Sequence, residues 1–343
     1  MIREVQYRMK VLRNGAEITE LRWADSAPRV NTDSTAEIKS SMVGTFMPNE
    51  TADLLRDELQ PCMVIDGHEH PLGVFCPTTV KALNAGTRQI AVEGYDRAWR
   101  LKAAKTESLL HMAAGSGYLA QAEQLLAAAG IALVIKTDSG AVLPADREYE
   151  LGSEYLAIVN QLLKEIGYRE IWFDAQGWAH LEPYLPPSAA RMARQYGGRE
   201  ITGLPMGESY TDETDIFEAP NVFICVCSNA DSREVLSASA VNDIPTSAKS
   251  IFRRGMRIPQ VTKVEQIADQ AALQVYADRL RDESLLGTRL VSFYTPAEPG
   301  HGVGDIIGIA RDELTGVYEE TGWSITMAAG ELMAHTARRT VIA

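Results

Sequence analysis

The stretch that decides the fold class lies at residues 38–46 and reads IKSSMVGTF. Alternate positions in it, from Ile38 through Met42 to Phe46, form a mostly apolar face, and the positions between them are mainly polar. A period of two residues is the repeat of a β-strand, whose successive side chains point to opposite sides of a sheet. This stretch therefore predicts a strand with one buried face.

A hairpin turn is predicted nearby at Asp66-Gly67, because this dipeptide tolerates the positive φ angles of tight turns. The paired strands are expected at residues 63–65 and 72–75, and a further strand-like run follows at 88–96. The first hundred residues therefore predict a small antiparallel β-sheet or barrel.

Helical spacing of apolar residues begins after residue 106. It predicts one helix over residues 118–129, ended by Gly130, because glycine readily adopts the left-handed conformation of a helix C-terminus. A second helix is expected to be capped by Ser153 and closed by Gly167. This middle region therefore differs in character from the strands before it.

The rest of the chain is expected to contain a strand at 221–229, a long helix and then more strands. A capping box at Thr262 and Glu265 predicts where the helix begins. The expected inner face of this helix is Val264, Ala268, Ala271, Val275 and either Arg279 or Leu280. The final strands are expected at 288–294, 305–310, 317–319 and 323–327. The chain is thus predicted to be an α+β, β-rich protein with strands at both ends.

The net charge narrows the possible functions. The 343 residues include 33 Lys and Arg and 46 Asp and Glu, for a formal charge of −13. A protein that grips nucleic acid needs clustered basic side chains, so this balance argues against that class. The longest apolar stretch, 125–135, is shorter than the roughly 20 residues of a membrane-spanning helix. The charged N-terminus lacks a secretory signal. We therefore expect a soluble protein without a membrane anchor, made in the cytoplasm.

The chain contains four cysteines, Cys62, Cys76, Cys225 and Cys227. A chain of this length with so few cysteines is not a small disulfide-stabilised domain, and we expect them to be reduced thiols. Cys225 and Cys227 share one face of their predicted strand. A single Cys-x-Cys lacks the second ligand pair of a zinc ribbon. We interpret both as small buried hydrophobic residues.

The motif His68-Glu69-His70 follows the predicted turn and is the most metal-like pattern in the sequence. Two imidazoles one residue apart on a strand point the same way and could share a zinc ion. Tetrahedral zinc sites use three or four protein ligands, and no obvious third ligand accompanies this pair. We favour a polar hairpin tip and keep the metal site as the alternative.

Residues 300–305 read GHGVGD and look like a phosphate-binding glycine loop. Such loops open a helix, whose N-terminal amides hold the phosphate. This loop precedes a strand-like run instead. We therefore interpret it as a connection between strands. The Gly-x-Ser-x-Gly elbow of many hydrolases is not found in the sequence.

The segment 208–218 is acidic and contains no basic residue. Two of its carboxylates could serve glycoside cleavage, which uses a pair of acids. Its acidic residues are Glu208, Asp212, Glu213, Asp215 and Glu218. Acidic loops without aromatic residues at binding spacing are commonly solvated surface, and we favour that interpretation.

A hairpin is predicted from strands at 169–175 and 178–184, and it is rich in aromatic residues. These are Trp172, Phe173, Trp178 and Tyr184. They could form a carbohydrate-binding platform. Cross-strand packing is the favoured interpretation, because aromatic pairs stabilise sheets by themselves.

Short motifs in a fixed order run along nearly the whole chain. They are Gly94-Tyr95-Asp96-Arg97 with Trp99 and Leu101, Tyr149-Glu150-Leu151-Gly152, Glu165-Ile166-Gly167-Tyr168, Phe173-Asp174 followed by Gly177, Ala219-Pro220-Asn221, Asn242-Asp243-Ile244-Pro245 leading to Ser250-Ile251, and Gly304-Asp305-Ile306. By their order and spacing the chain resembles the phage tail baseplate hub family, the late-control-D-like proteins.

This resemblance implies a structural virion protein rather than an enzyme. It implies a homotrimer in which each subunit contributes two related antiparallel β-barrels of the tail-tube type, joining the hexameric tail tube or distal tail protein to a trimeric spike or tail-tip protein. The expected domains are 1–105 as the first barrel, 106–205 as a mixed α/β middle domain, 206–285 as a strand and long-helix region that partly completes the barrels, and 286–343 as the second barrel.

The same resemblance implies contacts with other baseplate proteins, a place in the virion tail after assembly in the host cytoplasm, and a channel through which the genome passes without specific binding. An acidic lumen would let DNA slide. No catalytic, cofactor-binding or metal-binding residue is assigned. The alternatives are a carbohydrate-active or peptidoglycan-cleaving tail enzyme that uses segment 208–218, and a saccharide-binding module that uses Trp172 and Trp178.

Overall fold

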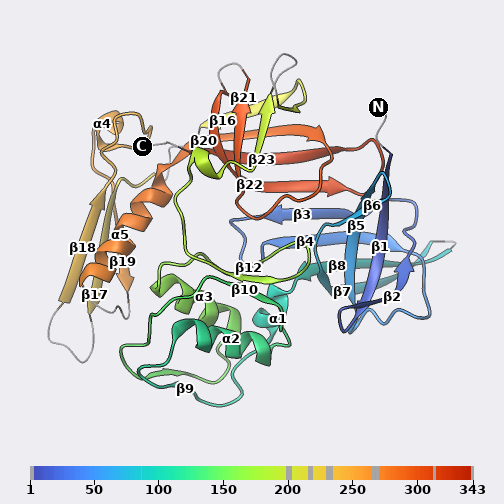
Figure 1. The fold of residues 1–343 in the computed structure, drawn as a ribbon, viewed down its shortest axis with the longest axis horizontal. Coiled ribbons are helices and arrows are strands. Elements are labelled where there is room, and N and C mark those ends of the chain that lie inside the picture. Colours follow the sequence, from blue (N-terminus) through green and yellow to red (C-terminus); the bar gives the residue numbers. More distant parts are fainter. Residues whose placement is uncertain are drawn as a thin grey trace.

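The computed structural model describes residues 4–85, 87–197, 203–214, 219–228, 235–264, 267, 270–311 and 314–340. Strands from the N-terminal and C-terminal thirds of the chain lie side by side in one large sheet, with helices below it and a smaller helix-covered sheet at one side (Figure 1). The β-rich α+β class predicted from the sequence is confirmed. In the described part of the chain, no helix combines the length and apolar character needed to cross a membrane.

The N-terminal third consists of strands. They are β1 (Val5–Arg13), β2 (Ala16–Leu21), β3 (Arg29–Asp33), β4 (Ser40–Phe46), β5 (Glu58–Ile65), β6 (His68–Pro71), β7 (Phe75–Ala85) and β8 (Thr87–Asp96). The stretch 38–46 contains β4, in which Met42 and Phe46 are completely buried and Val43 is exposed. The period-two alternation therefore located this strand and its buried face correctly.

The predicted turn at Asp66-Gly67 is confirmed, since both residues have positive φ, 49° and 83°. The second strand of this hairpin was predicted at 72–75, and this was wrong. The strand that pairs with β5 is β6, from Ile65↔His68 to Cys62↔Pro71, and residues 72–74 lie outside any strand. The polar residues of β6 lack the apolar alternation that the prediction required.

The middle of the chain contains the helices. Its elements are α1 (Ala98–Ala103), β9 (Leu110–Met112), α2 (Tyr118–Ala128), β10 (Val134–Lys136), β11 (Arg147–Tyr149), α3 (Tyr155–Glu165), β12 (Trp172–Phe173), β13 (Ala179–Leu181), the short helix η1 (Ala189–Arg191), β14 (Arg194–Gly197) and β15 (Leu204–Pro205). Helices α2 and α3 pack together in one apolar cluster. Gly130 and Gly167, just beyond their ends, have φ of 76° and 74°, as predicted.

Ser153 does not cap α3, so that prediction was wrong. The N-cap residue is Glu154, and it makes no side-chain cap hydrogen bond. The Ser153 hydroxyl instead donates to the carbonyl oxygen of Glu150 at 2.8 Å, within the turn that precedes the helix. Serine satisfies nearby backbone groups in turns as readily as it caps helices.

The C-terminal part returns to strands. Its elements are β16 (Tyr210–Thr214), β17 (Val222–Ser228), β18 (Val235–Val241), α4 (Ile251–Arg254), β19 (Pro259–Val264), α5 (Gln270–Leu285), β20 (Leu286–Pro296), β21 (Ile306–Ala310), β22 (Gly316–Thr326) and β23 (Leu332–Thr340). Strands β18, β17 and β19 form a separate sheet, and α5 packs against it. The predicted strand at 221–229 corresponds to β17.

The capping box proposed for the long helix was wrong. Thr262 lies in β19, paired with Cys225, and the helix begins only at Gln270. Glu265 and Ala268 lie outside the described residues. The buried face of α5 is formed by Leu273, Tyr276 and Ala277, whereas Val275 is 62% exposed. Of the predicted inner face, Leu280 packs partly buried against the same cluster, whereas Ala271 is exposed like Val275.

The last strands were predicted with one false break. Residues 317–319 and 323–327 were expected to be separate strands, yet β22 runs continuously from Gly316 to Thr326. A β-bulge between Glu320 and Gly322 interrupts its pairing with β23. A bulge adds one residue to a strand, and this disturbs the alternation on which the prediction relied.

Among the described residues the large sheet contains fifteen strands. Its main path runs in the order β15-β14-β21-β22-β3-β4-β8-β7-β5-β1-β2, and β23, β20 and β16 branch from β22. These pairings form an open path, so the two-barrel arrangement stays a prediction. The predicted boundaries at 105, 205 and 285 also stay predictions. The large sheet contains strands from all four predicted segments, because β3, β14 and β16 each pair with a strand of the last one.

Candidate functional site

Strand β22 connects the two β-rich ends of the chain. Its first half pairs with β21, and its second half pairs with β3, from Gly322↔Asp33 to Thr326↔Arg29. At Gly322 an added Cβ would lie 3.0 Å from the carbonyl oxygen of Thr32. The missing side chain therefore permits the close approach at which β22 changes its partner strand.

The bulge beside this junction buries an acid. The backbone N–H of Glu320 donates to the carbonyl oxygen of Asp305 at 2.8 Å, and its side chain is completely buried. Bulges commonly redirect a side chain next to a functional site. Here the bulge turns a carboxylate into the interior of the sheet.

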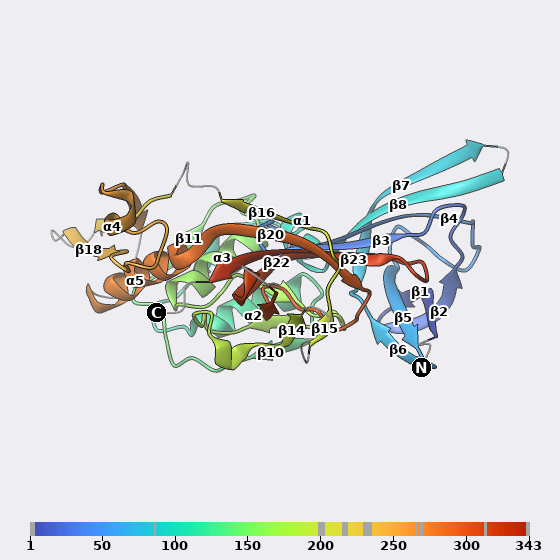
Figure 2. The same cartoon turned by 90° about the horizontal axis from the view of Figure 1, so that it is seen from above.

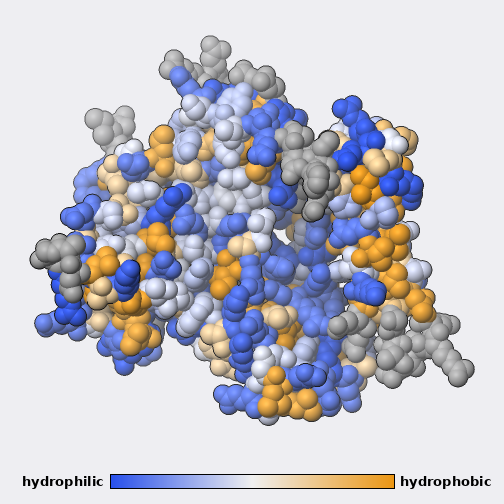
Figure 3. Space-filling model, turned by 180° about the vertical axis from the view of Figure 1, so that it is seen from behind, coloured by the Kyte–Doolittle hydropathy of each residue, from blue (hydrophilic) through white to orange (hydrophobic). Residues whose placement is uncertain are grey.

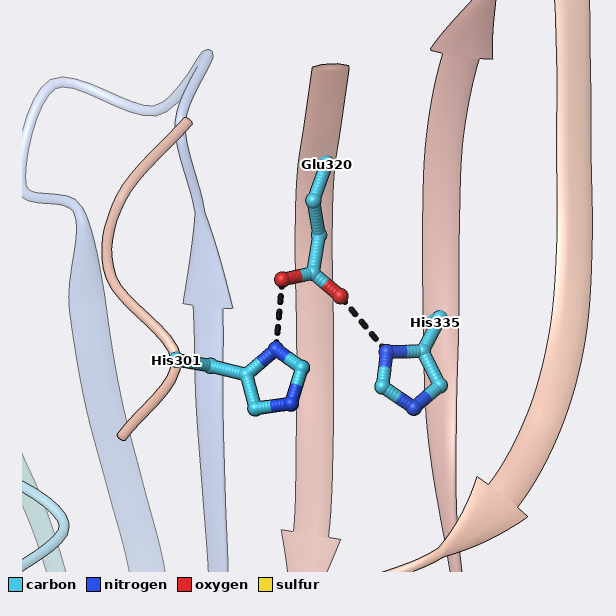
Figure 4. Close-up of side chains that lie close together, drawn as sticks. All are labelled: His301, Glu320 and His335. Carbon is cyan, nitrogen blue, oxygen red and sulfur yellow. Dashed lines mark hydrogen bonds and ion pairs between the residues drawn. The ribbon is translucent and has the colours of Figure 1, made fainter. Parts of the chain in front are cut away.

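Two histidines flank this carboxylate (Figure 4). Nδ1 of His301, in the loop before β21, lies 2.7 Å from Oε2 of Glu320. Nδ1 of His335, on β23, lies 2.5 Å from Oε1. Their side chains are 1% and 0% exposed. The His335 ring stacks on Phe293 at a centroid distance of 4.8 Å, so the cluster is embedded in apolar surroundings.

The protonation of this cluster follows from its burial and its contacts. Burial alone would raise the pKa of Glu320, but the hydrogen bonds from His301 and His335 outweigh it and the pKa lies below its usual value. Burial lowers the pKa of His335, and the neighbouring Glu320 only partly opposes this. At neutral pH these directions favour an ionised carboxylate beside a neutral His335 ring.

The hairpin of β7 and β8 projects away from the body of the molecule (Figure 2). Strand β7 pairs with β5 only at Leu59↔Phe75, while its pairing with β8 extends to Ala85↔Thr87. Strand β8 also pairs with β4 as far as Phe46↔Ile90, so within the described residues only the tip beyond Ala82↔Ile90 is two-stranded. The outer edge of β7 beyond Phe75 has no partner strand in the described part of the chain. On that strand Val80 is 40% exposed, and the neighbouring Lys81 and Ala82 are also exposed. This is an exposed strand edge available for pairing with another chain.

The sheet of β17, β18 and β19 has one covered and one open face. Cys225 and Cys227 face α5 and are buried at 0% and 1% exposure. The opposite face carries Ile224 and, on the neighbouring strand, Val261, which is 61% exposed. Hydrophobic residues gather in a band over this sheet, on the right-hand side of Figure 3. The interpretation of both cysteines as buried hydrophobic residues is confirmed.

The motif Gly94-Tyr95-Asp96-Arg97 joins the first strands to the helical region. The Asp96 carboxylate accepts hydrogen bonds from the backbone N–H groups of Ser40 and Ala98, both at 2.9 Å. The Arg97 guanidinium makes a two-point contact with Glu58 and donates to the carbonyl oxygen of Gly177 at 2.8 Å. Desolvation raises the pKa of Asp96 to about 6 despite its two hydrogen bonds.

The motif His68-Glu69-His70 forms β6. The His68 side chain is exposed, and Glu69 makes ion pairs with Arg8 and Lys10. Among the described residues, the only group of three or more potential metal ligands is the one at His301, not this motif. The structure therefore places the exposed His68 and the half-buried His70 on a polar hairpin.

The loop 300–305 connects β20 to β21, as interpreted from the sequence. Arg194 donates to the carbonyl oxygen of Gly300 at 2.6 Å, and the N–H of Gly302 donates to Asp305 at 2.9 Å. The loop is therefore held by its own chain. Its unexpected feature is the buried His301.

The described part of the acidic segment lies largely in β16, which pairs with β20. The Asp212 carboxylate accepts hydrogen bonds from Arg289, with Nε to Oδ1 at 2.7 Å, and these contacts hold the pKa of Asp212 below its usual value. Glu213 is exposed. Asp215 and Glu218 lie outside the described residues. The structure thus gives Asp212 an ion-pairing role across two strands.

The aromatic hairpin is formed by β12 and β13, as predicted. Trp172 stacks on its cross-strand partner His180 at a centroid distance of 4.1 Å, and Phe173 is buried in the cluster around α2 and α3. Tyr184 lies under the guanidinium of Arg279, at 5.1 Å. The cross-strand packing interpretation is confirmed for Trp172 and Phe173, whereas Trp178 is 38% exposed.

The His301–Glu320–His335 cluster was missed by sequence reasoning. His301 lay inside a loop considered only for phosphate binding, and Glu320 fell between two predicted strands. The available signal was the acid itself, since it interrupts an otherwise regular strand between Tyr318 and Trp323. The third member, His335, comes from a strand whose pairing with β22 could not be read from the sequence.

No protein-family model matches the sequence, and no curated protein matches it either. Solved structures do match its fold over nearly the whole chain. A tail protein from Neisseria meningitidis MC58 is 15% identical with a TM-score of 0.70, covering 98% of this chain and 97% of that one. The 43 kDa tail protein of prophage MuSo2 from Shewanella oneidensis is 11% identical with a TM-score of 0.66, covering 98% of both chains.

A third match comes from another kind of assembly. The E. coli c3393 protein, a component of the type VI secretion system with structural similarity to T4 bacteriophage tail proteins gp27 and gp5, is 12% identical with a TM-score of 0.55. The match covers 97% of this chain and 77% of that one. The chain therefore has the fold of phage tail proteins, as the sequence resemblance implied.

Proposed function

We propose that this chain is the structural hub of a phage or phage-like tail baseplate. In this role it is a homotrimeric adaptor between the hexameric tail tube and a trimeric spike or tip, and it forms part of the channel for the genome. The likeness in fold to two tail proteins, over at least 97% of every chain compared, supports this assignment.

The observation that carries the proposal is the continuous sheet through β22 and β3. An adaptor that offers a six-fold partner two surfaces per subunit must hold its two β-rich ends at a fixed relative position. The ladder from Gly322↔Asp33 to Thr326↔Arg29 does this with backbone hydrogen bonds. Two domains tied only by a flexible linker would leave the spacing of those surfaces undefined.

The projecting hairpin of β7 and β8 supports the homotrimer. An isolated two-stranded hairpin is marginally stable in water, and an exposed strand edge pairs readily with another chain. When this edge pairs with a different surface on a second copy, the contact is head-to-tail. Such contacts close into a ring when the rotation between subunits allows it.

The open face of the β17–β19 sheet supports contacts with other baseplate proteins. It presents apolar side chains, including Ile224 and Val261, on the side opposite α5. A contiguous exposed apolar surface commonly marks a protein interface.

An acidic lining of the genome channel remains part of the proposal. The net charge of −13 supports it, because acidic side chains disfavour adhesion of DNA.

The experiment is native mass measurement of the full chain, alone and coexpressed with the tail genes of its own locus. We expect trimers, at least in the presence of the spike. Val80→Asp on the hairpin should abolish them, because a charge at a strand edge blocks pairing. Val142→Asp, at a 52% exposed position in the middle region, is the matched control. Monomers in every preparation would contradict the proposed trimer. Trimers formed by the Val80→Asp variant would show that the hairpin is not part of the trimer interface.

A further inference from the structure

The buried cluster of His301, Glu320 and His335 brings three possible metal ligands together. The Thr295 hydroxyl lies 2.9 Å from the carbonyl oxygen of Pro296 and 2.7 Å from Nε2 of His335. When the hydroxyl donates its one proton to the carbonyl oxygen, its own oxygen accepts from Nε2–H of His335. These contacts are compatible with a ring that carries its proton on Nε2.

In this arrangement a neutral His335 ring turns the lone pair of Nδ1 toward Oε1 of Glu320, 2.5 Å away. In the opposite arrangement Nδ1 donates its N–H to the carboxylate and Nε2 accepts from the Thr295 hydroxyl. A cation bound between His335 and Glu320 selects the first arrangement, because imidazole binds a metal through a ring lone pair.

The surroundings of the cluster suit a bound cation. The side chains of Glu320 and His335 are completely buried, and that of His301 is 1% exposed. Carboxylate oxygen and imidazole nitrogen both bind metals through a lone pair. A buried carboxylate is costly unless it is paired or binds a metal ion, and a divalent cation bound here would supply its positive partner.

We propose that His301, Glu320 and His335 bind one divalent transition-metal ion of the zinc class. The ligands are Nδ1 of each histidine and the carboxylate of Glu320. One ligand atom from each residue lies within 4.8 Å of the others. Imidazole nitrogen and carboxylate oxygen are both zinc ligands, and a bidentate carboxylate completes four positions.

The next layer of contacts supports this assignment. Metal-binding histidines usually donate their other ring N–H to a neighbouring acceptor, which fixes the ring. The Thr295 hydroxyl, 2.7 Å from Nε2 of His335, is placed to accept in this way, and the Tyr196 hydroxyl lies 3.3 Å from Nε2 of His301. With all four positions filled by protein atoms, the site is structural rather than catalytic.

The consequence concerns the junction between the two β-rich ends. The three ligands come from the loop before β21, from the bulge of β22 and from β23. Gly322, where β22 begins to pair with β3, lies two residues beyond Glu320. A metal ion bound here would fix the loop and the two strands at the point where the sheet passes from one end of the chain to the other.

The test uses untagged full-length protein, stripped with a chelator and dialysed against Zn²⁺ or Co²⁺. We expect one equivalent of metal per chain, visible absorption bands typical of tetrahedral Co²⁺, and a midpoint of thermal unfolding that rises on adding Zn²⁺. The absorption bands are measured on the wild type, so this result does not depend on whether a variant folds.

Variants then locate the metal. His335→Gln should lose the bound equivalent, whereas His70→Gln, on the polar hairpin of β6, should retain it. Wild-type protein that takes up no metal and shows no thermal shift overturns the proposal and leaves a proton shared between His335 and Glu320. Metal that is lost in His70→Gln but kept in His335→Gln also overturns it.

Discussion

Arg97 and Glu58 join two regions of the chain through a nearly buried ion pair. Nη2 of Arg97 lies 2.7 Å from Oε2 of Glu58, and Nε lies 2.9 Å from Oε1. The two side chains are only 12% and 7% exposed. Because Arg97 also contacts Gly177, this pair connects β5 to the turn between β12 and β13.

Arg97→Ala should lower the free energy of unfolding by about 3 kcal/mol, since it leaves a buried carboxylate with one partner fewer. Chemical denaturation measures the change. The control is Lys102→Ala, which breaks an ion pair with Glu37 whose side chains are 41% and 51% exposed. Exposed pairs contribute about 0–1 kcal/mol. If Arg97→Ala and Lys102→Ala lower the free energy of unfolding equally, the Arg97–Glu58 pair does not act as a structural connection.

Asp96 should make stability depend on pH in an unusual direction. Its pKa rises from 3.8 to about 6 on folding, so between these values the folded state binds the proton more tightly than the unfolded chain. Stability from this group is therefore greatest at low pH and falls as the pH rises through that window. The full effect is on the order of 3 kcal/mol.

The measurement for Asp96 is the stability of wild type relative to Asp96→Asn at several pH values, because the difference cancels other titrating groups. The wild type should lose stability relative to the variant between about pH 4 and pH 7. A difference that is constant over this range contradicts the raised pKa.

Gly322→Ala should destabilise the junction of β22 and β3 by about 1–3 kcal/mol, because the new Cβ meets the backbone carbonyl of Thr32. Gly140→Ala adds the same methyl group where nothing lies within 4 Å and serves as the matched control. Thermal unfolding compares the two. If Gly322→Ala leaves the midpoint of thermal unfolding unchanged, the strands can move apart at this position without loss of stability.

Asp212 should prove structural rather than catalytic. Wild-type protein is expected to leave cell walls intact on a zymogram, and Asp212→Asn should lower stability by only about 0–1 kcal/mol because its pair with Arg289 is partly exposed. Clearing of cell walls by the wild type that disappears in Asp212→Asn would favour the enzyme alternative.

The sequence predicted those elements whose signal is local. Alternation over 38–46 located β4, glycines marked the ends of α2 and α3, and Asp66-Gly67 marked its turn. Each of these depends on backbone preferences within a few residues. The start of α5 was predicted wrongly because Thr262 and Glu265 have the spacing of a capping box, although Thr262 pairs with Cys225 in β19.

The buried cluster could not be predicted for a different reason. Its three residues meet only because β22 pairs with β23 and because a bulge redirects Glu320. Strand pairing between segments is set by packing across the sheet, and neither His301 nor His335 has a sequence neighbour that reveals it. The junction of β3 with β22 joins residues almost 300 positions apart in the chain and was equally hidden.

The central claim is the hub assignment, and electron cryomicroscopy of assembled tail particles that contain this chain tests it most directly. The account predicts three copies in a ring at the tip of the tail tube, with the β7–β8 hairpin of each copy against its neighbour. Particles in which this chain is absent from the tip, or present there in a number other than a threefold ring, would contradict it.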